Sequence, residues 1–221
     1  MNYAIVLAGG KGVRLGADRP KQFVIIKDEP MIVKTIKAFN SVDEIDEIIV
    51  VCLEEYISYL NELVEEYSLN KVKKVVDGGN SRQLSVYAGL EALEKANISK
   101  DDIVLIHDGA RPFVSKEIIL NNIKAAKEND AAITVIKSTD SVLLSKQGEV
   151  VDFYLNRDEV YNCQTPQTFK FGLILKAHKK AKEDGVVHAS DDASLVIRMN
   201  QKVSIVLGDI NNKKITYKED L

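Results

Sequence analysis

The sequence predicts an α/β protein with a mostly parallel, twisted sheet and helices on both faces. Short apolar runs, such as 46–53 and 103–107, alternate with stretches of helical periodicity, such as 82–95 and 115–129. Strands that alternate with helices of this length favour parallel pairing, with the helices packed on the two faces. The 221 residues are 45% hydrophobic, enough for one large domain with a substantial core. We therefore expect a single domain over 1–221.

Each expected element has a local signal. The strands are expected at 3–7, 46–53, 73–76, 103–107, 131–137 and 202–207. The helices are expected at 30–40, 54–67, 82–95, 115–129, 171–184 and 191–199. Ser81 and Ser115 stand directly before two of these helices, where a side-chain oxygen can cap the free N–H groups of the first turn. Pro30 suits the first turn of another.

Residues 139–156 interrupt the alternation. Two strand-like arms flank Lys146-Gln147-Gly148, whose turn chemistry predicts a β-hairpin. A hairpin that projects from an α/β core has little of its own chain to pack on. We therefore expect an arm that embraces a second subunit in a homodimer, in preference to one that folds back.

Composition excludes several classes of protein. The formal net charge of −3 provides no overall basic field, which argues against nucleic acid as the main partner. No apolar run reaches the length of a membrane span, and the N-terminus lacks the basic and apolar regions of a signal peptide. Cys52 and Cys163 match no metal motif and are expected to be buried thiols. These features predict a cytoplasmic protein without a membrane partner.

The segment 7–22 is the most informative part of the chain. It follows an apolar strand and contains four glycines, Arg14 and Lys21. Glycines let successive backbone N–H groups converge on phosphate oxygens, and the two cations would neutralise a triphosphate. A nucleoside triphosphatase P-loop would need Ser or Thr at Gly12, and a dinucleotide fingerprint would need glycine at Leu15. A plain glycine-rich turn remains the alternative to a nucleotide site.

Two further segments follow expected strands. Asp108 ends the strand at 103–107, and a carboxylate beside a bound triphosphate implies an intervening cation such as Mg²⁺. A turn-capping aspartate is the alternative. The turn at 78–81 leads into a helix whose N-terminus, with Arg82 and Ser85, suits a base, ribose or phosphate contact.

Other polar segments suit a phosphorylated substrate. Arg157 is of the residue type that binds phosphate in bidentate fashion, and one of Lys213 and Lys214 is expected to reach a ligand. The segment 164–169 is expected to be a turn. The three histidines form no cluster in sequence, and His178 is expected on a Lys-rich helix face.

These motifs together resemble one family. The chain is similar to the cytidylyltransferases that activate 2-C-methyl-D-erythritol 4-phosphate or, in a sister group, D-ribitol 5-phosphate. The resemblance covers nearly the whole length, in matching order. It rests on L-A-G-G-x-G-x-R-L-G-x-x-x-P-K-Q at 7–22, D-G-G-x-x-R-x-x-S-V at 77–86, H-D-G-A-R-P at 107–112, N-R-D-E-x-Y-x-x-Q-T-P-Q-T-F at 156–169 and S-D-D-A-S at 190–194.

The resemblance implies a Rossmann-like nucleotidyltransferase fold, a dimer and a set of site residues. Arg14 and Lys21 would be the catalytic cations. The residues that it implies for CTP are Ala8, Gly9, Gly10, Gly79, Asn80, Ser85 and Gly109. Those that it implies for the polyol phosphate or the metal are Asp108, Arg111, Ser141, Arg157, Thr165 and Lys214. Because the arm of such dimers reaches the partner's site, Ser141 and Arg157 are candidates to act in the neighbouring subunit.

The expected activity is transfer of CMP from CTP to a polyol phosphate, with release of pyrophosphate. The arm sequence 139–143 is closer to the ribitol phosphate group, whereas 190–194 and the spacing before Pro20 favour the methylerythritol group. We expect 2-C-methyl-D-erythritol 4-phosphate as the acceptor, with D-ribitol 5-phosphate as the alternative. A nucleotidyltransferase that uses UTP or GTP and a non-catalytic nucleotide-binding regulator are the remaining alternatives, and the glycine spacing disfavours an oxidoreductase.

Overall fold

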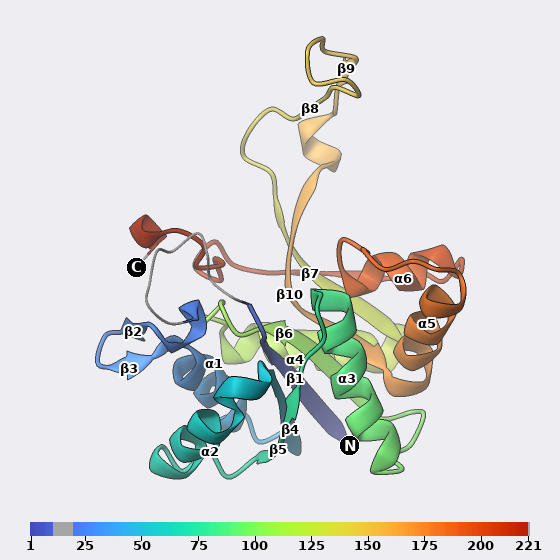
Figure 1. Ribbon diagram of the computed structural model, residues 1–221. Coiled ribbons are helices and arrows are strands. Elements are labelled where there is room, and N and C mark those ends of the chain that lie inside the picture. Colours follow the sequence, from blue (N-terminus) through green and yellow to red (C-terminus); the bar gives the residue numbers. More distant parts are fainter. Residues whose placement is uncertain (11–19, 221) are drawn as a thin grey trace.

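A computed structural model of the protein describes residues 1–10 and 20–220. Arg14, Gly12 and Gly16 lie outside the described residues. Within them, seven strands form one sheet in the order β11-β7-β10-β6-β1-β4-β5 (Figure 1). These strands are β1 (Asn2–Ala8), β4 (Glu47–Cys52), β5 (Val72–Asp77), β6 (Ile103–Asp108), β7 (Ala131–Lys137), β10 (Tyr161–Lys170) and β11 (Ser204–Leu207). The pairs are parallel except those that β10 makes with β6 and β7. The expected mostly parallel sheet is confirmed.

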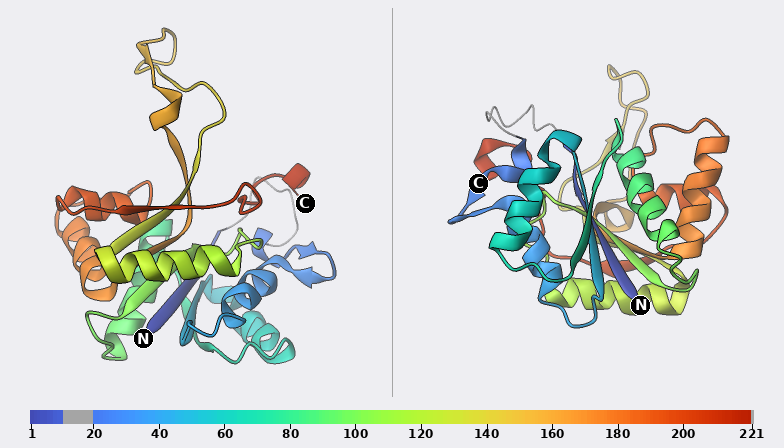
Figure 2. Two further views of the ribbon diagram at one scale, coloured as in Figure 1. Left: turned by 180° about the vertical axis from the view of Figure 1, so that it is seen from behind. Right: turned by 60° about the horizontal axis from the view of Figure 1, so that its bottom comes forward.

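The helices cover both faces of the sheet, as Figure 2 shows. They are α1 (Met31–Asn40), α2 (Ile57–Glu66), α3 (Arg82–Lys95), α4 (Lys116–Asn129), α5 (Phe171–Glu183) and α6 (Asp192–Arg198). Short 3₁₀ turns are η2 (Lys21–Phe23), η3 (Glu54–Tyr56), η4 (Arg157–Glu159) and η5 (Lys218–Asp220), and β2 (Ile25–Ile26) pairs with β3 (Glu29–Pro30).

Alternation along the central strands divides the interior into two cores. Along β1, Ala4 and Val6 point into a core shared with α1, α2 and α4, whereas Ile5 points into a core shared with α3, α5 and α6. Successive side chains of a strand face opposite sides, so a strand that is apolar throughout must be covered twice. The polar caps agree with their prediction: Ser81 Oγ accepts from Leu84 N at 3.1 Å, and Ser115 Oγ accepts from Ile118 N at 3.2 Å.

The turn expected at 164–169 is wrong, because these residues lie inside β10, a strand of ten residues. The pattern concealed the strand: its buried positions carry polar side chains, and Pro166 cannot donate to a neighbouring strand. The pairing with β7 shifts register between Cys163 and Gln167, which accommodates the proline. Thr134 Oγ1 donates to the Pro166 carbonyl at 2.7 Å, so the polar strand is satisfied inside the fold.

The segment 139–156 forms the expected hairpin and extends from the body of the molecule (Figure 1). Its short strands, β8 (Leu143–Leu144) and β9 (Phe153–Tyr154), pair antiparallel. The hairpin follows the carboxyl end of β7 and precedes the start of β10. Because β6 and β7 are both antiparallel to β10, they run in one direction, and the hairpin leaves at the edge where β6 also ends.

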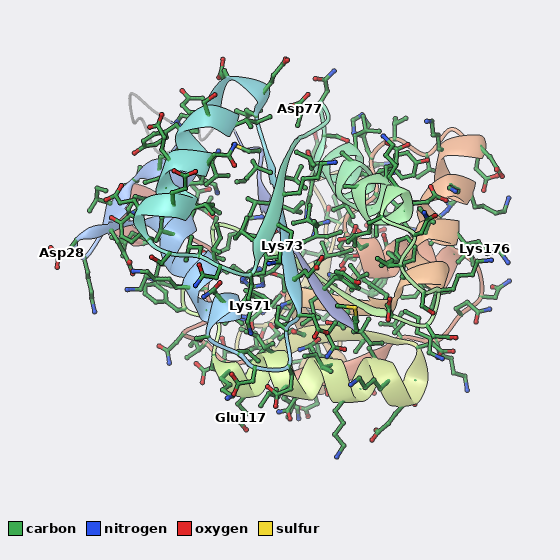
Figure 3. All side chains as sticks on the ribbon, turned by 90° about the horizontal axis from the view of Figure 1, so that it is seen from below. Asp28, Lys71, Lys73, Asp77, Glu117 and Lys176 are labelled. Carbon is green, nitrogen blue, oxygen red and sulfur yellow. The ribbon has the colours of Figure 1, made fainter. Side chains whose placement is uncertain are left out.

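One edge of the sheet carries charged side chains. Edge strand β5 exposes Lys73, and Figure 3 shows this side chain, with Asp77, at the margin of the sheet. Charged side chains on an edge strand discourage pairing with another sheet.

Two further expectations concern the cysteines and membrane spans. Cys52 is buried as expected, but Cys163 is exposed near the start of β10, so the expectation of two buried thiols is wrong. Within residues 1–10 and 20–220, no helix has the length and apolar character needed to cross a membrane.

Candidate active site at the carboxyl edge of the sheet

A cavity of about 670 Å³ lies at the carboxyl ends of β1, β4, β5 and β6 and is the candidate site. Strand order reverses beside β1: the chain runs outward through β4 and β5, then returns to place β6 on the other side of β1. Open α/β sheets bind ligands at such a point. The cavity is lined by Leu7, Gly9, Gly10, Lys21, Gln22, Leu53, Gly79, Asn80, Ser81, Arg82, Ser85, Asp108, Gly109, Ala110, Lys214 and Thr216.

Two glycines that line the cavity let neighbouring segments of the chain approach closely. A Cβ at Gly109 would lie 2.7 Å from the carbonyl oxygen of Leu7 and 2.8 Å from Ile32 Cδ1. A Cβ at Gly79 would clash with the Cβ of Leu84, in the first turn of α3. Only glycine therefore fits where β6 ends against β1 and where the turn after β5 meets α3.

Asp108 is the central carboxylate of the cavity. Its Oδ1 accepts from Arg82 Nε at 3.2 Å, and its Oδ2 accepts from Lys214 Nζ at 2.7 Å. Burial by itself would raise the pKa of Asp108, but the positive charges of Arg82 and Lys214 outweigh burial and hold that pKa well below its usual range. Asp108 is therefore ionised at neutral pH, and it fixes two cations at the cavity wall.

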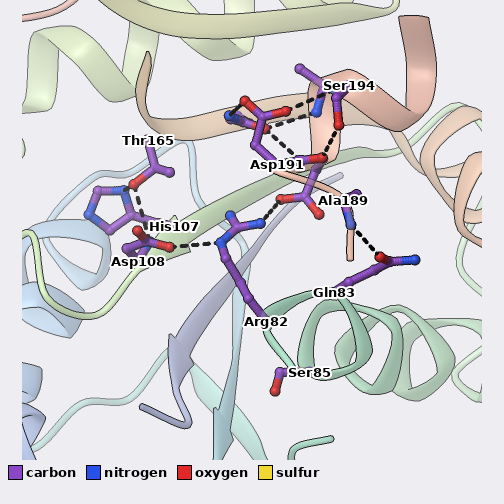
Figure 4. Close-up of polar contacts among 12 residues, drawn as sticks. Arg82, Gln83, Ser85, His107, Asp108, Thr165, Ala189, Asp191 and Ser194 are labelled. Carbon is purple, nitrogen blue, oxygen red and sulfur yellow. Dashed lines mark hydrogen bonds and ion pairs between the residues drawn. The ribbon is translucent and has the colours of Figure 1, made fainter. Parts of the chain in front are cut away.

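The Arg82 guanidinium lies between two carboxylates. Its Nε contacts Asp108, and its Nη1 donates to Asp192 Oδ2 at 2.8 Å. Burial alone would lower the pKa of Arg82, but the negative charges of Asp192 and Asp108 raise it above its ordinary value. Figure 4 shows the side chain reaching from the start of α3 toward Asp108, with Ser85 on the same helix.

The C-terminal segment completes the cavity wall. The backbone N–H of Ile215 donates to Ala110 O at 2.8 Å, which holds the segment beside the end of β6. Lys21 Nζ donates to Ile215 O at 3.0 Å, so the first loop and the C-terminal segment meet at this point. Of the two candidate lysines, Lys214 lies on the cavity and contacts Asp108, whereas Lys213 lies 4.0 Å from Asp220.

A buried polar layer supports the end of β6. The amide of Asp108 donates to Thr165 Oγ1 at 3.1 Å, and that hydroxyl donates to His107 Nδ1 at 3.0 Å (Figure 4). His107 Nε2 donates to the carbonyl of Arg111 at 3.1 Å, which requires the tautomer protonated at Nε2. Arg111 donates from Nη1 to Asn212 O at 2.7 Å, which ties the C-terminal segment down. Burial lowers the pKa of Arg111.

His107 predicts a pH dependence of stability. Burial lowers its pKa to about 4 from 6.5, so the unfolded chain binds this proton more readily than the folded one. The stability that the folded state gains from the neutral, buried His107 is fully present above pH 6.5 and is lost as pH falls toward 4. Between pH 7 and pH 5 the free energy of unfolding should fall by about 2 kcal/mol from this group. Urea titrations at both pH values should show this difference between wild type and His107→Gln; equal pH slopes would contradict it.

The predicted site residues divide into three groups. Those that line the cavity are Gly9, Gly10, Lys21, Gly79, Asn80, Arg82, Ser85, Asp108, Gly109 and Lys214. Ala8, Arg111 and Thr165 are buried beside it and make backbone or hydroxyl contacts within the fold. Ser141 and Arg157 are exposed on and beside the hairpin, and neither lines this cavity. Arg14 lies outside the described residues.

Two residues of the site were not anticipated. Asp192, at the start of α6, binds Arg82, and His178 of α5 binds Asp192 from behind. We expected His178 on a Lys-rich helix face, and the structure places its side chain in the interior, where it is only 2% exposed. The S-D-D-A-S motif was a signal for Asp192, but the sequence did not indicate which side chain it would face.

The donor set around Asp108 bears on the expected magnesium ion. Within residues 1–10 and 20–220, no group of three or more His, Cys, Asp and Glu side chains is placed to hold a metal. Mg²⁺ at nucleotide sites is commonly bound by one or two carboxylates together with substrate phosphates and water. Asp108 therefore fits a metal that arrives with a triphosphate, and it does not fit a metal cage built from the protein alone.

Comparison with known proteins gives a consistent result. The model of the IspD family, 2-C-methyl-D-erythritol 4-phosphate cytidylyltransferase, matches residues 2–221. The 2-C-methyl-D-erythritol 4-phosphate cytidylyltransferase of Clostridium acetobutylicum is 40% identical over 222 residues, which cover 100% of this chain and 94% of the relative. The ribitol-5-phosphate cytidylyltransferase of Streptococcus agalactiae serotype III is 37% identical over 221 residues, covering 100% and 92%.

Solved structures agree with the sequence relatives. The 4-diphosphocytidyl-2C-methyl-D-erythritol synthase of Anaerococcus prevotii superposes with a TM-score of 0.86 at 34% identity, covering 100% of this chain and 92% of that one. The enzyme of Francisella tularensis gives a TM-score of 0.83 at 27% identity, covering 99% and 95%. The match to the family model, the whole-length relatives and the shared fold together show that this chain belongs to the IspD family of cytidylyltransferases.

Proposed function

We propose that this cytidylyltransferase transfers CMP from CTP to 2-C-methyl-D-erythritol 4-phosphate and releases pyrophosphate. The observation that carries the proposal is the cavity itself, in which glycine turns, the start of α3 and the cations Lys21, Arg82 and Lys214 surround one space. Such a space suits two phosphorylated molecules. Relatives with this acceptor in their names match the chain at 40% and 41% identity over its full length.

The reaction joins two anions. An oxygen of the acceptor phosphate attacks the α-phosphorus of CTP in line, and the bond from that phosphorus to the oxygen bridging to the β-phosphorus breaks. Pyrophosphate leaves with the electron pair, and the acceptor becomes a cytidine diphosphate ester. Because a phosphate dianion is already a nucleophile, the protein must mainly hold the reactants together and stabilise charge at the α-phosphorus.

The described residues suit these tasks. The backbone at Gly9 and Gly10 and the N-terminus of α3 offer N–H groups to phosphate or ribose oxygens. Lys21 supplies positive charge in the cavity next to the first glycine loop. The resemblance assigns the same task to Arg14. Lys214, held by Asp108, also lines the cavity and would bind a second phosphate.

Magnesium belongs to this proposal as a companion of CTP. Asp108 would hold it together with the phosphate oxygens, and the ion would neutralise charge on the triphosphate. Each oxygen of Asp108 accepts one hydrogen bond, from Arg82 or from Lys214, so the metal would bind a remaining lone pair of this carboxylate.

The direct test is pyrophosphate release from CTP with matched acceptors. We expect turnover with 2-C-methyl-D-erythritol 4-phosphate, weak turnover with D-ribitol 5-phosphate, and none with an unphosphorylated polyol. Parallel reactions with UTP, GTP and ATP test the nucleotide. A preference for ribitol 5-phosphate would overturn the acceptor and keep the reaction class. A lack of pyrophosphate release with every acceptor would overturn the function.

D-Ribitol 5-phosphate is the second candidate because of specific observations. Streptococcal relatives named for that acceptor are 37% identical over the full chain. The arm sequence Thr139-Asp140-Ser141 is also closer to that group. Replacing Ser141 with alanine should raise the KM for the acceptor more than the KM for CTP, whichever acceptor is used.

We propose further that the hairpin 139–156 packs on a second copy of the chain. Several large apolar side chains are exposed along it, among them Phe153 at 48% and Tyr154 at 67%. These side chains remain largely exposed in the single chain, and a cluster of exposed apolar side chains is typical of an interaction surface. Arg157 follows the hairpin and is exposed, and the family resemblance implies that it acts in the partner's site.

Complementation between inactive variants tests this arrangement. Arg157→Ala and Lys21→Ala should each inactivate a homodimer, whereas mixed dimers would carry one site with both residues intact if Arg157 acts across the interface. Random mixing should then restore roughly a quarter of wild-type activity, because half of the dimers are mixed and each holds one working site of two. No recovery after subunit exchange, verified by native mass spectrometry, would place Arg157 and Lys21 in the same chain's site.

A further inference from the structure

Behind the cavity lies a buried ionic contact that no step of the proposed reaction uses. Asp192, the first residue of α6, is 1% exposed, and His178 of α5 is 2% exposed. Asp192 Oδ2 accepts from Arg82 Nη1 at 2.8 Å, and Asp192 Oδ1 accepts from His178 Nε2 at 3.1 Å. The carboxylate is ionised, because the Arg82 charge and the His178 hydrogen bond outweigh burial and lower its pKa. Through Asp192, α6 thus contacts Arg82, a residue that lines the cavity, and α5 supports this contact through His178.

The Asp192 side chain has no evident task in building α6. The N-cap of that helix is Asp191, whose Oδ1 accepts from Ser194 N at 2.9 Å. The first turn is also held through its backbone, since Gln167 Oε1 accepts from the N–H groups of Asp192 and Ala193, each at 3.0 Å. A buried carboxylate is costly unless it is paired, and the pairing here is directed at Arg82.

The Arg82 guanidinium is fixed from two sides. Nε is bound to Asp108 and Nη1 to Asp192, and a planar group bound at two of its nitrogens has a determined orientation. Nη2 is buried and has no hydrogen-bond partner in the part of the chain that the structure describes. A buried donor without a partner calls for an explanation, and one explanation is a ligand group that arrives later. Arg82 lines the cavity, so that ligand would be the nucleotide.

We propose that Asp192, backed by His178, is a positioning residue that holds Arg82 so that Nη2 donates to an oxygen of bound CTP. This inference rests on the proposed function for the identity of the ligand. Without Asp192, the nearest anion to Arg82 is Asp108, which also binds Lys214. Only Nε of Arg82 would then be hydrogen-bonded, and the two Nη groups of the guanidinium would lose their fixed orientation.

Matched variants separate positioning from general stability. Asp192→Asn keeps the shape of the side chain but removes the charge that holds Arg82, and Asp191→Asn makes the same change one residue away without a contact to Arg82. We expect Asp192→Asn to lower kcat/KM for CTP about 10–100-fold, the range seen when outer partners of a site residue are removed. Asp191→Asn should leave it unchanged. His178→Gln, which keeps the Asp192 charge, should lower it less.

The double variant tests whether Asp192 acts through Arg82. If it does, Arg82→Lys with Asp192→Asn should be no less active than Arg82→Lys alone, because the lysine has no fork to orient. Full addition of the two effects would overturn the proposal and assign Asp192 a separate, structural role. Melting temperatures of all variants are compared, and a variant that does not fold is replaced in the comparison by His178→Gln.

A spectroscopic measurement distinguishes failure of this proposal from failure of the proposed function. In protein labelled with ¹⁵N-arginine, the Arg82 side-chain resonances are assigned by their loss in Arg82→Lys, and the Nη1 proton that donates to Asp192 should exchange slowly in wild type and in Asp191→Asn. It should exchange fast in Asp192→Asn. Equal protection in all three would overturn the positioning role, whatever the enzyme's substrate. Absence of pyrophosphate release in wild type would instead overturn the function and leave this result standing.

Discussion

Replacing Lys21 with alanine is expected to lower kcat for pyrophosphate release about 10²–10³-fold, the effect of removing one preorganised electrostatic group. Lys21 begins η2, lines the cavity beside Gly9 and Gly10, and donates to Ile215 O. Its positive charge therefore lies beside the glycine loop to which we assign the triphosphate. The loss should appear in kcat more than in the KM for CTP, because negative charge builds up at the α-phosphorus only in the transition state.

Lys124→Ala provides the matched control. Lys124 is an exposed lysine on α4 that does not line the cavity, and its removal changes the net charge equally. It should keep wild-type turnover, measured by coupled pyrophosphate detection at saturating CTP. The resemblance predicts a comparable fall for Arg14→Ala. A Lys21→Ala enzyme with turnover near that of Lys124→Ala would rule out the electrostatic mechanism.

Asp108→Asn is expected to lower kcat/KM for both substrates about 10²-fold, the scale of an ångström-sized misplacement in an active site. The carboxylate holds Arg82 on one oxygen and Lys214 on the other. An amide keeps the size of the group but removes the charge that holds two mutually repelling cations close together. Lys214, which is the more exposed of the two, should leave its position first.

Steady-state kinetics with each substrate varied in turn, together with the dependence on Mg²⁺ concentration, checks this prediction. If Asp108 also holds the metal with the triphosphate, the Mg²⁺ concentration for half-maximal rate should rise in Asp108→Asn. Lys214→Met, which keeps the carboxylate, should impair use of the acceptor without that rise. Unchanged kinetics in Asp108→Asn would reduce this carboxylate to a structural role at the end of β6.

The helices and parallel strands could be predicted because their signals are local. Ser81 and Ser115 cap helices that begin at Arg82 and Lys116, and apolar runs mark the strands that are buried on both faces. β10 could not be predicted in this way. Its buried polar residues are satisfied by partners distant in sequence, such as Thr134 with Pro166 O and Asn212 with Thr165 O, and a local pattern carries no trace of them.

The residues of the candidate site show the same difference between local signals, which can be predicted, and contacts between distant residues, which cannot. Motifs predicted Lys21, Asp108 and the glycine turns, since loops after parallel strands meet at one edge of the sheet. The sequence did not reveal that Lys214 and Arg82 share Asp108, or that Asp192 stands behind Arg82. Those contacts join residues that are 26, 110 and 106 positions apart in the sequence, and tertiary packing alone decides them. The burial of His178 was not foreseen for the same reason: lysines are its neighbours in sequence, yet its own face of α5 is buried.

The central claim is that this cavity receives the triphosphate of CTP between the first glycine loop and the start of α3. A crystal structure of the protein with CTP and Mg²⁺ tests it most directly. We predict phosphate oxygens within hydrogen-bond distance of the Gly9–Gly10 backbone and Lys21 Nζ, with the cytidine beside Gly79, Asn80 and Ser85. Cytidine bound outside these turns, or Lys21 directed away from the phosphates, would contradict the account.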